Sequence, residues 1–415
     1  MTAAETLPGP AGALNHGQHH DLDALLGSHL DELVAFRRQL HAHPELSGRE
    51  FATTESISSR LQVSGLVART LRSGTGCVAD VPGTRPGPVV ALRADIDALA
   101  MDEALDAPYR SRVAGAAHCC GHDVHTTIVL AAGLILARLL RRRDAPPGSA
   151  RLIFEPSEES VPGGAVEIVR SGYLKGVTAI YGLHCDPKLE TGRLGVTTGP
   201  ITSAADVLEV HLTGPGGHTA RPDQTVDLVK VAARIAVEAP LVMEAQSSHP
   251  DAVRLVFGSL RAGHAPNVVP SSAHLFGTLR AKDRADWDAA PDLFAAAVHD
   301  IVEPTGAAWN ISYERGVPPV VNDPQATALL ASTAAELLGA ANVVEAGQSW
   351  GGDSFAWYLE KAPGTYARLG VHDPRTDGPR RDLHSSNFTV DENAIGVGVR
   401  LLVATTIATL RAQAQ

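Results

Sequence analysis

Residues 118–125 bring two different kinds of metal-binding side chain close together in the chain. The segment reads His-Cys-Cys-Gly-His-Asp-Val-His, so a single glycine separates the thiol of Cys120 from the imidazole of His122. Thiolate and imidazole ligands suit zinc or a similar first-row ion, whereas magnesium and calcium prefer oxygen. A long apolar stretch follows directly. The segment therefore predicts a transition-metal site at the start of a helix.

Three further segments supply donors that could complete such a site. A glutamate pair, Glu158 and Glu159, follows one strand-like run, His184 ends another, and His384 follows a leucine late in the chain. Two ions can be held if one ligand is shared, and a thiolate is a suitable bridge because metal binding removes its proton. We therefore predict two divalent ions per chain (zinc, manganese or cobalt), with Cys120 as the bridge and His122, Glu159, His184 and His384 as the other ligands.

Glu158 is next to a predicted ligand and is our candidate general base. Ions of this kind polarise a carbonyl and lower the pKa of bound water to about 7, and a nearby carboxylate can then accept the proton of that water. Simpler interpretations remain open for each residue. His184 could be a hydrogen-bonded histidine, Cys120 a buried apolar residue, and the glutamates a solvated pair.

The composition excludes several classes of protein. The chain has 35 basic and 46 acidic residues, a formal net charge of -11 and a pI near 5.9. We expect no nucleic acid as a partner, because phosphate contacts need a basic surface. Four cysteines at irregular spacing do not suggest a disulfide framework and favour a reducing, cytoplasmic location. The partner we expect is a small-molecule substrate.

No segment predicts secretion or membrane insertion. Residues 1–20 lack a charged start followed by an apolar run, and we interpret them as a flexible tail. The most apolar stretch, residues 128–140, is interrupted by Arg138 and is too short to cross a bilayer. We therefore expect no association with a membrane.

Strand and helix patterns alternate along the first half of the chain. Short β-branched runs at 77–81, 89–92, 151–154 and 177–183 are separated by helical patterns. This alternation predicts an α/β fold with a mainly parallel sheet covered on both faces. Ligands of such sheets bind beyond the carboxyl ends of the strands. Asp95, the glutamate pair and His184 each follow or end a different strand, so we expect them at one edge.

The pattern changes from about residue 199. The order strand-helix-strand-strand-helix-strand matches a compact ferredoxin-like α+β module. The helical patterns near the C-terminus resemble those of the first half of the chain. We therefore predict a catalytic domain in two parts, residues 1–198 and 316–415, with an inserted domain at 199–315.

Eight motifs, taken together and in order, resemble one known family. They are HAHPELSGRE, ALRADIDAL, HCCGHDVH, IFEPSEES, GLHCDP, GPGGHTARP, NVVPSSA with GTLR, and DLHSSNFTVDE, and they span nearly the whole chain. The chain is similar to the aminoacylase/carboxypeptidase family of co-catalytic metallohydrolases. Within that family it resembles the branch of amino-acid-conjugate, hippurate and N-acyl-amino-acid hydrolases.

The resemblance implies a zinc-peptidase-like catalytic domain and roles for particular residues. It implies the five metal ligands named above, Glu158 as base, and Asp95 as an acidic residue that orients a ligand. The inserted domain would be a lid and dimerisation surface, so we expect a homodimer. Its helix carries apolar positions suited to this contact: Val226, Val229, Val231 and Ile235. In the lid, the resemblance places His218 on the scissile carbonyl, sometimes from the partner subunit, and Asn267 and Arg280 at substrate-binding positions.

We therefore expect a metal-dependent amidohydrolase that cleaves N-acyl amino acids or similar conjugates by attack of a metal-bridged water. The alternatives are a dipeptidase or carboxypeptidase of the same family, and a non-catalytic binding protein on the same fold. Two departures from the family pattern concern substrate preference. The usual Gly-Gly-Glu-Asp-Phe is replaced by Gly-Gly-Asp-Ser-Phe at 351–355, which removes one carboxylate, and Ala100 replaces a proline.

Overall fold

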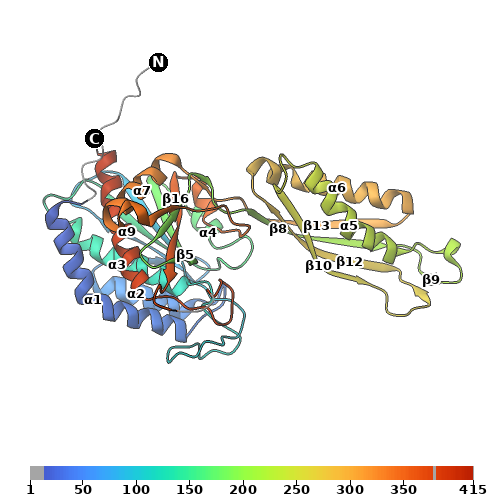
Figure 1. The fold of residues 1–415 in the computed structure, drawn as a ribbon, viewed down its shortest axis with the longest axis horizontal. Coiled ribbons are helices and arrows are strands. Elements are labelled where there is room, and N and C mark those ends of the chain that lie inside the picture. Colours follow the sequence, from blue (N-terminus) through green and yellow to red (C-terminus); the bar gives the residue numbers. More distant parts are fainter. Residues whose placement is uncertain (1–13, 377–379, 415) are drawn as a thin grey trace, which may run out of the picture. The chain divides into compact units, whose positions relative to one another are not determined.

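The computed structural model describes residues 14–376 and 380–414, which form two compact units (Figure 1). The second unit comprises Pro200–Val321 and Gln348–Ala356, and the rest belongs to the first. These boundaries differ from the sequence-based ones at residues 316–321 and 348–356, which we had placed in the catalytic domain. Hydrogen bonds explain the second difference: Gln348 Nε2 donates to the carbonyl oxygens of Thr202 (3.0 Å) and Lys282 (2.9 Å).

The first unit is built around an eight-stranded sheet with the order β1-β2-β4-β3-β5-β16-β6-β15. The strands are β1 (Ala68–Thr70), β2 (Cys77–Pro82), β3 (Val89–Asp95), β4 (Ser149–Glu155), β5 (Val177–Glu190), β6 (Leu194–Val196), β15 (Val343–Glu345) and β16 (Gly364–His372). The helices are α1 (His16–Ala42), α2 (Phe51–Val63), α3 (His122–Leu139), α4 (Ala165–Arg170), α7 (Pro324–Leu338), η3 (Ala340–Asn342), α8 (Ala356–Leu359), which starts at the boundary, and α9 (Asn393–Gln413).

The centre of this sheet is parallel, as expected. β3 pairs in parallel with both β4 and β5, and β5 pairs in parallel with β16. The carboxyl ends of β3, β4 and β5 therefore meet at one edge. Strands β3 and β4 and the first part of β5 are largely buried, which is consistent with the apolar residues at their centres.

Two long apolar helices, α3 and α9, pack on each other, and α1 packs on both. In Figure 1 these three helices gather on one side of the sheet. By length and composition, α3 and α9 could each cross a membrane, but 89% and 83% of the tested stretches are buried inside the protein. We had expected the stretch at 128–140 to be too short to cross a bilayer, but all of it except residue 140 belongs to α3, which has 18 residues. Packing in the core accounts for the apolar character of both helices.

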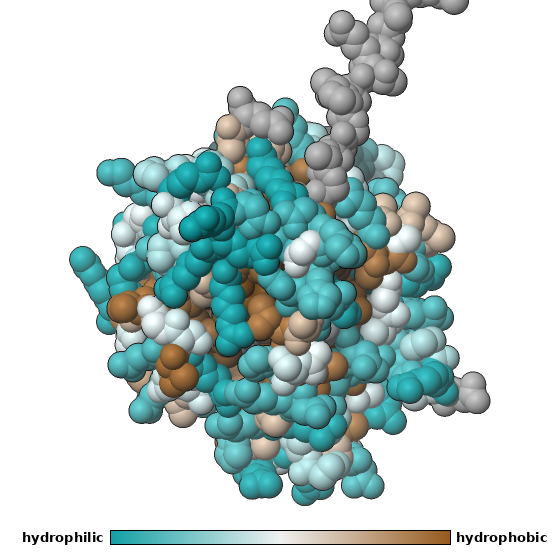
Figure 2. Space-filling view, turned by 90° about the vertical axis from the view of Figure 1, so that its left-hand side faces the viewer, coloured by the Kyte–Doolittle hydropathy of each residue, from teal (hydrophilic) through white to brown (hydrophobic). Residues whose placement is uncertain are grey.

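The outer face of the first unit is mainly hydrophilic, with apolar residues visible in a hollow (Figure 2). Helices α1, α2 and α3 also border a groove of about 590 Å³, lined by Leu26, Leu33 and Phe36 among others. None of the predicted site residues lines this groove. The predicted chemistry therefore lies elsewhere, at the carboxyl edge of the sheet.

The start of α1 corrects our interpretation of residues 1–20 as a tail. Residues 1–13 lie outside the described part of the chain, but α1 begins at His16. The Asn15 side chain accepts a hydrogen bond from the backbone of Gln18 (2.9 Å), and the Gln18 side chain accepts one from the backbone of Asn15 (3.1 Å). This reciprocal capping box fixes the helix start. Leu14 and Gln18 are buried, so the segment is part of the first unit.

The second unit has a four-stranded antiparallel sheet with the order β10-β12-β8-β13, which is ferredoxin-like. Its elements are β8 (Ala204–Thr213), β9 (Gly217–His218), η1 (Pro222–Gln224), α5 (Leu228–Ala245), β10 (Val253–Ala262), β11 (Val268–Val269), β12 (Ser272–Ala281), α6 (Arg284–Val302), η2 (Glu303–Thr305) and β13 (Ala308–Val317). The short strands β7 (Gly199–Pro200) and β14 (Val321–Asn322) lie where the chain passes between units.

The cap at Asn15 can be tested directly. We expect Asn15→Ala to lower the free energy of unfolding by about 1 kcal/mol, because an N-cap side chain satisfies a backbone N–H at the helix start. His20→Ala is the control, since the His20 side chain is 79% exposed. Chemical denaturation of both variants measures the difference. Equal stability of the two would mean that the helix does not begin at this cap.

Candidate metal centre

Four segments of the first unit carry the predicted ligands to one place. Cys120 and His122 flank the start of α3, Glu158 and Glu159 lie in the loop after β4, and His384 lies in the loop before α9. His184 lies within β5, which runs on to Glu190, and not at its end as we had expected. The physical reason is that β5 extends beyond the end of β3. The pairing of β3 with β5 stops at Gly182, whereas β16 still pairs with β5 at His184.

The turn between Cys120 and His122 depends on a glycine. Gly121 is the N-cap residue of α3 and has φ = 90°, a conformation that residues with a Cβ rarely adopt. A Cβ atom at this position would also lie 2.8 Å from Sγ of Cys185. The glycine therefore lets the chain bring a thiol and an imidazole to the same side of the helix start.

His122 and His184 are each fixed by a hydrogen bond from Nδ1, which leaves Nε2 facing the other predicted ligands. His122 Nδ1 donates to the backbone oxygen of Asp97 (3.0 Å), with a carboxylate oxygen of Asp97 at 3.2 Å. His184 Nδ1 donates to the backbone oxygen of Cys185 (2.7 Å). A histidine that binds a metal almost always donates its other ring N–H in this way.

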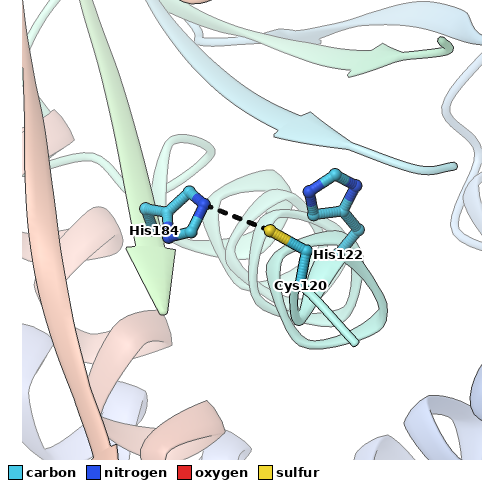
Figure 3. A group of neighbouring side chains, drawn as sticks. All are labelled: Cys120, His122 and His184. Atoms are coloured by element: carbon cyan, nitrogen blue, oxygen red, sulfur yellow. Dashed lines mark hydrogen bonds between the residues drawn. The ribbon is translucent and has the colours of Figure 1, made fainter. Parts of the chain in front are cut away.

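The free ligand atoms converge on one another. Sγ of Cys120 lies 3.5 Å from Nε2 of His184, as the dashed line in Figure 3 marks, and His122 stands beside them. Oε1 of Glu159 lies 3.7 Å from Nε2 of His122 and 3.3 Å from Nε2 of His384. Oε2 of Glu158 lies 4.0 Å from Nε2 of His122. The structure thus brings all five predicted ligands and the predicted base together.

Two buried atoms in this cluster indicate that it is built for a cation. Nε2 of His122 and Oε1 of Glu159 have no hydrogen-bond partner among the described residues. Leaving such atoms buried and unpaired costs about 1–3 kcal/mol each. A divalent ion between them would satisfy both. Thiolate, imidazole and carboxylate donors in overlapping groups of three also fit zinc-like ions.

Backbone strain accompanies two of the loops. Ser157, just before the glutamate pair, has φ = 57°, and His384 has φ = 59°. Positive φ is uncommon for residues with a side chain and persists where the surroundings impose it. At His384 the backbone N–H donates to the oxygen of Cys119 (2.8 Å), which ties the late loop to the ligand segment.

Comparison with known proteins identifies the family. The model of peptidase family M20/M25/M40 matches residues 91–408. The chain belongs to this family. It is therefore a metal-dependent amidohydrolase in class, and its α/β fold is the M20 fold.

Three relatives of this M20 chain illustrate the match. It is 35% identical to the N-acetyl-L-cysteine deacetylase of Bacillus subtilis, covering 88% of this chain and 85% of that one. A dinuclear metal-binding M20 peptidase from Bacillus subtilis has a crystal structure that matches with a TM-score of 0.79, 31% identity, and coverage of 93% of this chain and 99% of that one. A Rhodococcus jostii protein named as a glutamate–cysteine ligase is 44% identical over 94% of this chain. The M20 chain spans only 49% of that protein's length.

The residue that fixes the ring of His122, a predicted ligand, is Asp97, which our site prediction omitted. Its second carboxylate oxygen accepts from the backbone of Glu159 (2.9 Å) and from Ser47 Oγ (2.6 Å). One carboxylate thereby fixes two predicted ligands. The sequence did offer a signal, because Asp97 lies two residues beyond Asp95 at the end of β3.

Asp95 itself has a different position from the one we expected. Its carboxylate bonds to Nδ1 of His125 (2.6 Å) and to Arg93 (2.6 Å), and it lies 3.7 Å from Nε2 of His122. That distance is too long for a hydrogen bond. His125 in turn accepts from the backbone of Cys185 (2.8 Å), so both of its nitrogens are used within the fold. Asp95 therefore anchors β3 to α3 and does not orient a ligand directly.

Burial and charge shape the titration of the cluster. Burial raises the pKa of the Cys120 thiol and lowers the pKa of His184. Burial opposes a charge on His122 as well, but the negative charge of Asp95 and the hydrogen bond to Asp97 outweigh it and raise the pKa of His122. A cation bound here would compensate the cost of burying a thiolate.

The remaining predicted residues lie in the second unit. His218 in β9 pairs with Val268 in β11, and the backbone oxygen of Asn267 accepts from Thr219 (3.2 Å), so His218 and Asn267 are near neighbours. Both side chains are exposed. Arg280 lies apart from this pair, near the end of β12.

Replacing Asp97 tests its orienting role. We expect Asp97→Ala to weaken metal binding about 10- to 100-fold, because residues that hold metal ligands typically have effects of this size. Competition with a chromophoric chelator measures the affinity. Asp300→Ala, which removes an exposed carboxylate of α6, is the control. Unchanged affinity in Asp97→Ala would contradict the assignment.

Proposed function

We propose that this enzyme hydrolyses the amide bond of N-acyl amino acids or closely related conjugates, with two divalent ions as cofactors. The observation that carries the proposal is the convergence of Cys120, His122, Glu159, His184 and His384 beside Glu158. The residues fit the ions, because two of their buried atoms otherwise lack partners. Ions bound there would supply Lewis acidity for the carbonyl and for the attacking water.

Glu158 is the residue that we propose to move the proton. Its side chain is only 10% exposed, and it is held beside the ligands by the strained turn at Ser157. It would accept a proton from water as the water attacks the carbonyl carbon. When the C–N bond breaks, it would return that proton to the leaving nitrogen. A single carboxylate thus serves as base and then as acid.

His218 is the residue that we propose to contact the carbonyl oxygen. Its Nδ1 accepts a hydrogen bond from the backbone of Ala220 (3.1 Å), which leaves Nε2–H as a donor. A hydrogen-bond donor that contacts the developing oxyanion usually stabilises the transition state strongly. Exposed Asn267 beside it is our candidate for a further substrate contact.

Relatives are named for both substrate classes, acylated amino acids and peptides, and the deacetylase and amidohydrolase names support our proposal of an acylated amino acid. The Bacillus subtilis relative is named a deacetylase of N-acetyl-L-cysteine, whereas the solved M20 neighbour is titled a peptidase. Cleavage of dipeptides or of C-terminal residues is therefore the second candidate. A panel of N-acyl amino acids and dipeptides, tested with zinc, manganese and cobalt separately, distinguishes the two.

The first prediction for this function concerns Glu158. We expect Glu158→Gln to lower kcat by about 100- to 10,000-fold while metal content stays unchanged, because general base catalysis has this magnitude and Gln cannot accept the proton. Release of alanine from N-acetyl-L-alanine and metal analysis give the two readouts. Glu55→Gln, at an exposed position of α2, should behave as wild type. A Glu158→Gln enzyme with near-normal turnover would refute the assignment.

We also propose a homodimer through α5 of the second unit. Our sequence-based contact set is partly wrong, because Val231 and Ile235 are buried within the unit. Of the predicted set, Val229 does face outward (46% exposed), and Val237 (64%) and Leu241 (61%) share its exposure. With Ala233, these positions recur every four residues and form one apolar stripe, a pattern suited to a helix packing on its symmetry mate.

The dimer proposal predicts an effect at Leu241. We expect Leu241→Glu to convert the dimer to a monomer, because a buried unpaired charge opposes association. Val63→Glu, at a 90% exposed site of the first unit, is the control. Light scattering gives the mass of each variant. A monomeric wild type, or a dimer that survives Leu241→Glu, would rule out this surface.

A further inference from the structure

His41, near the end of α1, is a buried histidine with a carboxylate beside each ring nitrogen. Its Nε2 lies 2.7 Å from Oε1 of Glu103, and its Nδ1 lies 2.8 Å from Oδ2 of Asp123. None of the three side chains is more than 2% exposed. An ionised carboxylate only accepts hydrogen bonds, so a ring that donates to both is a protonated imidazolium. The geometry therefore places a positive charge between two buried carboxylates.

The ion pairs continue from Asp123 along α1. Its Oδ2 lies 2.7 Å from Nε of Arg37, whose Nη1 lies 3.4 Å from Oε1 of Glu392. Arg38 donates to the same glutamate from Nε (2.9 Å) and from Nη2 (2.6 Å). Negative and positive side chains thus alternate in one array, called here the charge chain: Glu103, His41, Asp123, Arg37, Glu392 and Arg38.

The two ends of the charge chain hold the loop that carries His384. At one end, the backbone of Ala104, which follows Glu103, donates to the oxygen of Ser386 (2.6 Å). At the other end, Glu392 is the N-cap residue of α9, where this loop ends. The side chain of His384 is 53% exposed, so its position depends on how the loop that carries it is held.

Glu103 is the connection between α1 and this late loop. Its other carboxylate oxygen accepts from the backbone of Ser111 (2.5 Å), and the next residue, Arg112, donates from its backbone to the oxygen of Ala42 (2.9 Å). These bonds hold the segment after β3 against the end of α1. The hydrogen bond from His41 to Glu103 therefore fixes the backbone that contacts Ser386.

The charge on His41 depends on the groups that face its ring. They are two carboxylates, one cation and two further rings: Glu103, Asp123, Arg37, Tyr109 and His118. Burial opposes the charge, and so does Nη2 of Arg37 at 3.1 Å, but the carboxylates outweigh both and raise the pKa of His41. The charge is therefore present below this raised pKa and is lost as the pH rises through it.

We propose that His41 is a positioning residue for the predicted ligand His384 and acts through the charge chain. The imidazolium holds Glu103, and the backbone that follows Glu103 holds the loop at Ser386. Without the charge, one of two buried carboxylates loses its donor, and a buried carboxylate without a partner destabilises the contacts around it. The proposal rests on the proposed metal centre, because it explains how one ligand of that centre is held.

Metal affinity as a function of pH tests the role of the charge. We expect His41→Gln to weaken the binding of one zinc ion about tenfold or more at neutral pH, the size typical of residues that hold metal ligands. The ratio of wild-type to variant affinity should fall toward one as the pH rises through the pKa of His41, because both proteins then lack the charge. Competition with a chromophoric chelator gives this ratio, in which the deprotonation of the ligands cancels.

His43→Gln is the matched control. His43 lies two residues beyond His41, is exposed, and its Nδ1 bonds to the backbone oxygen of Gln39 (3.0 Å). This variant should bind zinc as the wild type does at every pH. An affinity ratio for His41→Gln that stays constant with pH would show a purely structural role, and a ratio of one throughout would show no role. Either result would overturn the proposal.

Hydrogen exchange of the metal-free full chain separates this proposal from the proposed function. Residues 382–392 should exchange faster in His41→Gln than in His43→Gln, while β5 stays equally protected in both. Glu103→Gln removes the carboxylate that His41 holds and should give the same local increase, so it replaces His41→Gln if that variant folds poorly. Equal exchange in this segment, or faster exchange throughout the first unit, would contradict the proposal. A local increase without hydrolysis of any N-acyl amino acid would support it and reject the proposed function.

Discussion

The geometry of the predicted metal centre depends on the hydrogen bonds that fix two buried histidines. His122 and His184 each donate from Nδ1 to a fixed backbone oxygen, and this leaves Nε2 directed at a buried thiol or carboxylate. Among the described residues, neither Nε2 of His122 nor Oε1 of Glu159 has a hydrogen-bond partner, although Oε1 of Glu159 lies 3.3 Å from Nε2 of His384. Buried polar atoms without hydrogen bonds lower the stability of the fold, so two of them this close together indicate a binding site between them. The thiol, imidazole and carboxylate groups there fit a pair of divalent ions.

The sheet explains how such distant residues meet. Strands β4, β3 and β5 are parallel neighbours, so the loop after β4, the end of β3 and the continuation of β5 share one edge. The start of α3 reaches the same edge through the turn at Gly121. Asp97 then connects the start of α3, the loop after β4 and the segment between α1 and α2, since it bonds to His122, to the backbone of Glu159 and to Ser47.

Much of this arrangement could be predicted from the sequence, and the exceptions have physical causes. Residue type and the order of strands and helices led us to propose Cys120, His122, Glu159 and His184 as ligands, and the structure brings these side chains close together. The partner of each predicted ligand was not predictable: Asp95 ends β3 and Asp97 lies two residues beyond it, and only the three-dimensional structure shows which carboxylate reaches Nδ1 of His122. The outward face of α5 was also misjudged, because apolar residues surround much of that helix and the sequence does not show which of them face the sheet. The start of α1 was missed because its capping box uses Asn15 and Gln18, which we had assigned to a tail.

X-ray absorption at the zinc edge of the zinc-loaded protein, with metal content measured on the same sample, tests the central claim most directly. The account predicts two ions per chain with a sulfur neighbour at about 2.3 Å, and it predicts that this sulfur signal disappears in Cys120→Ser. A spectrum with only nitrogen and oxygen neighbours, or a sulfur signal that persists in Cys120→Ser, would contradict it.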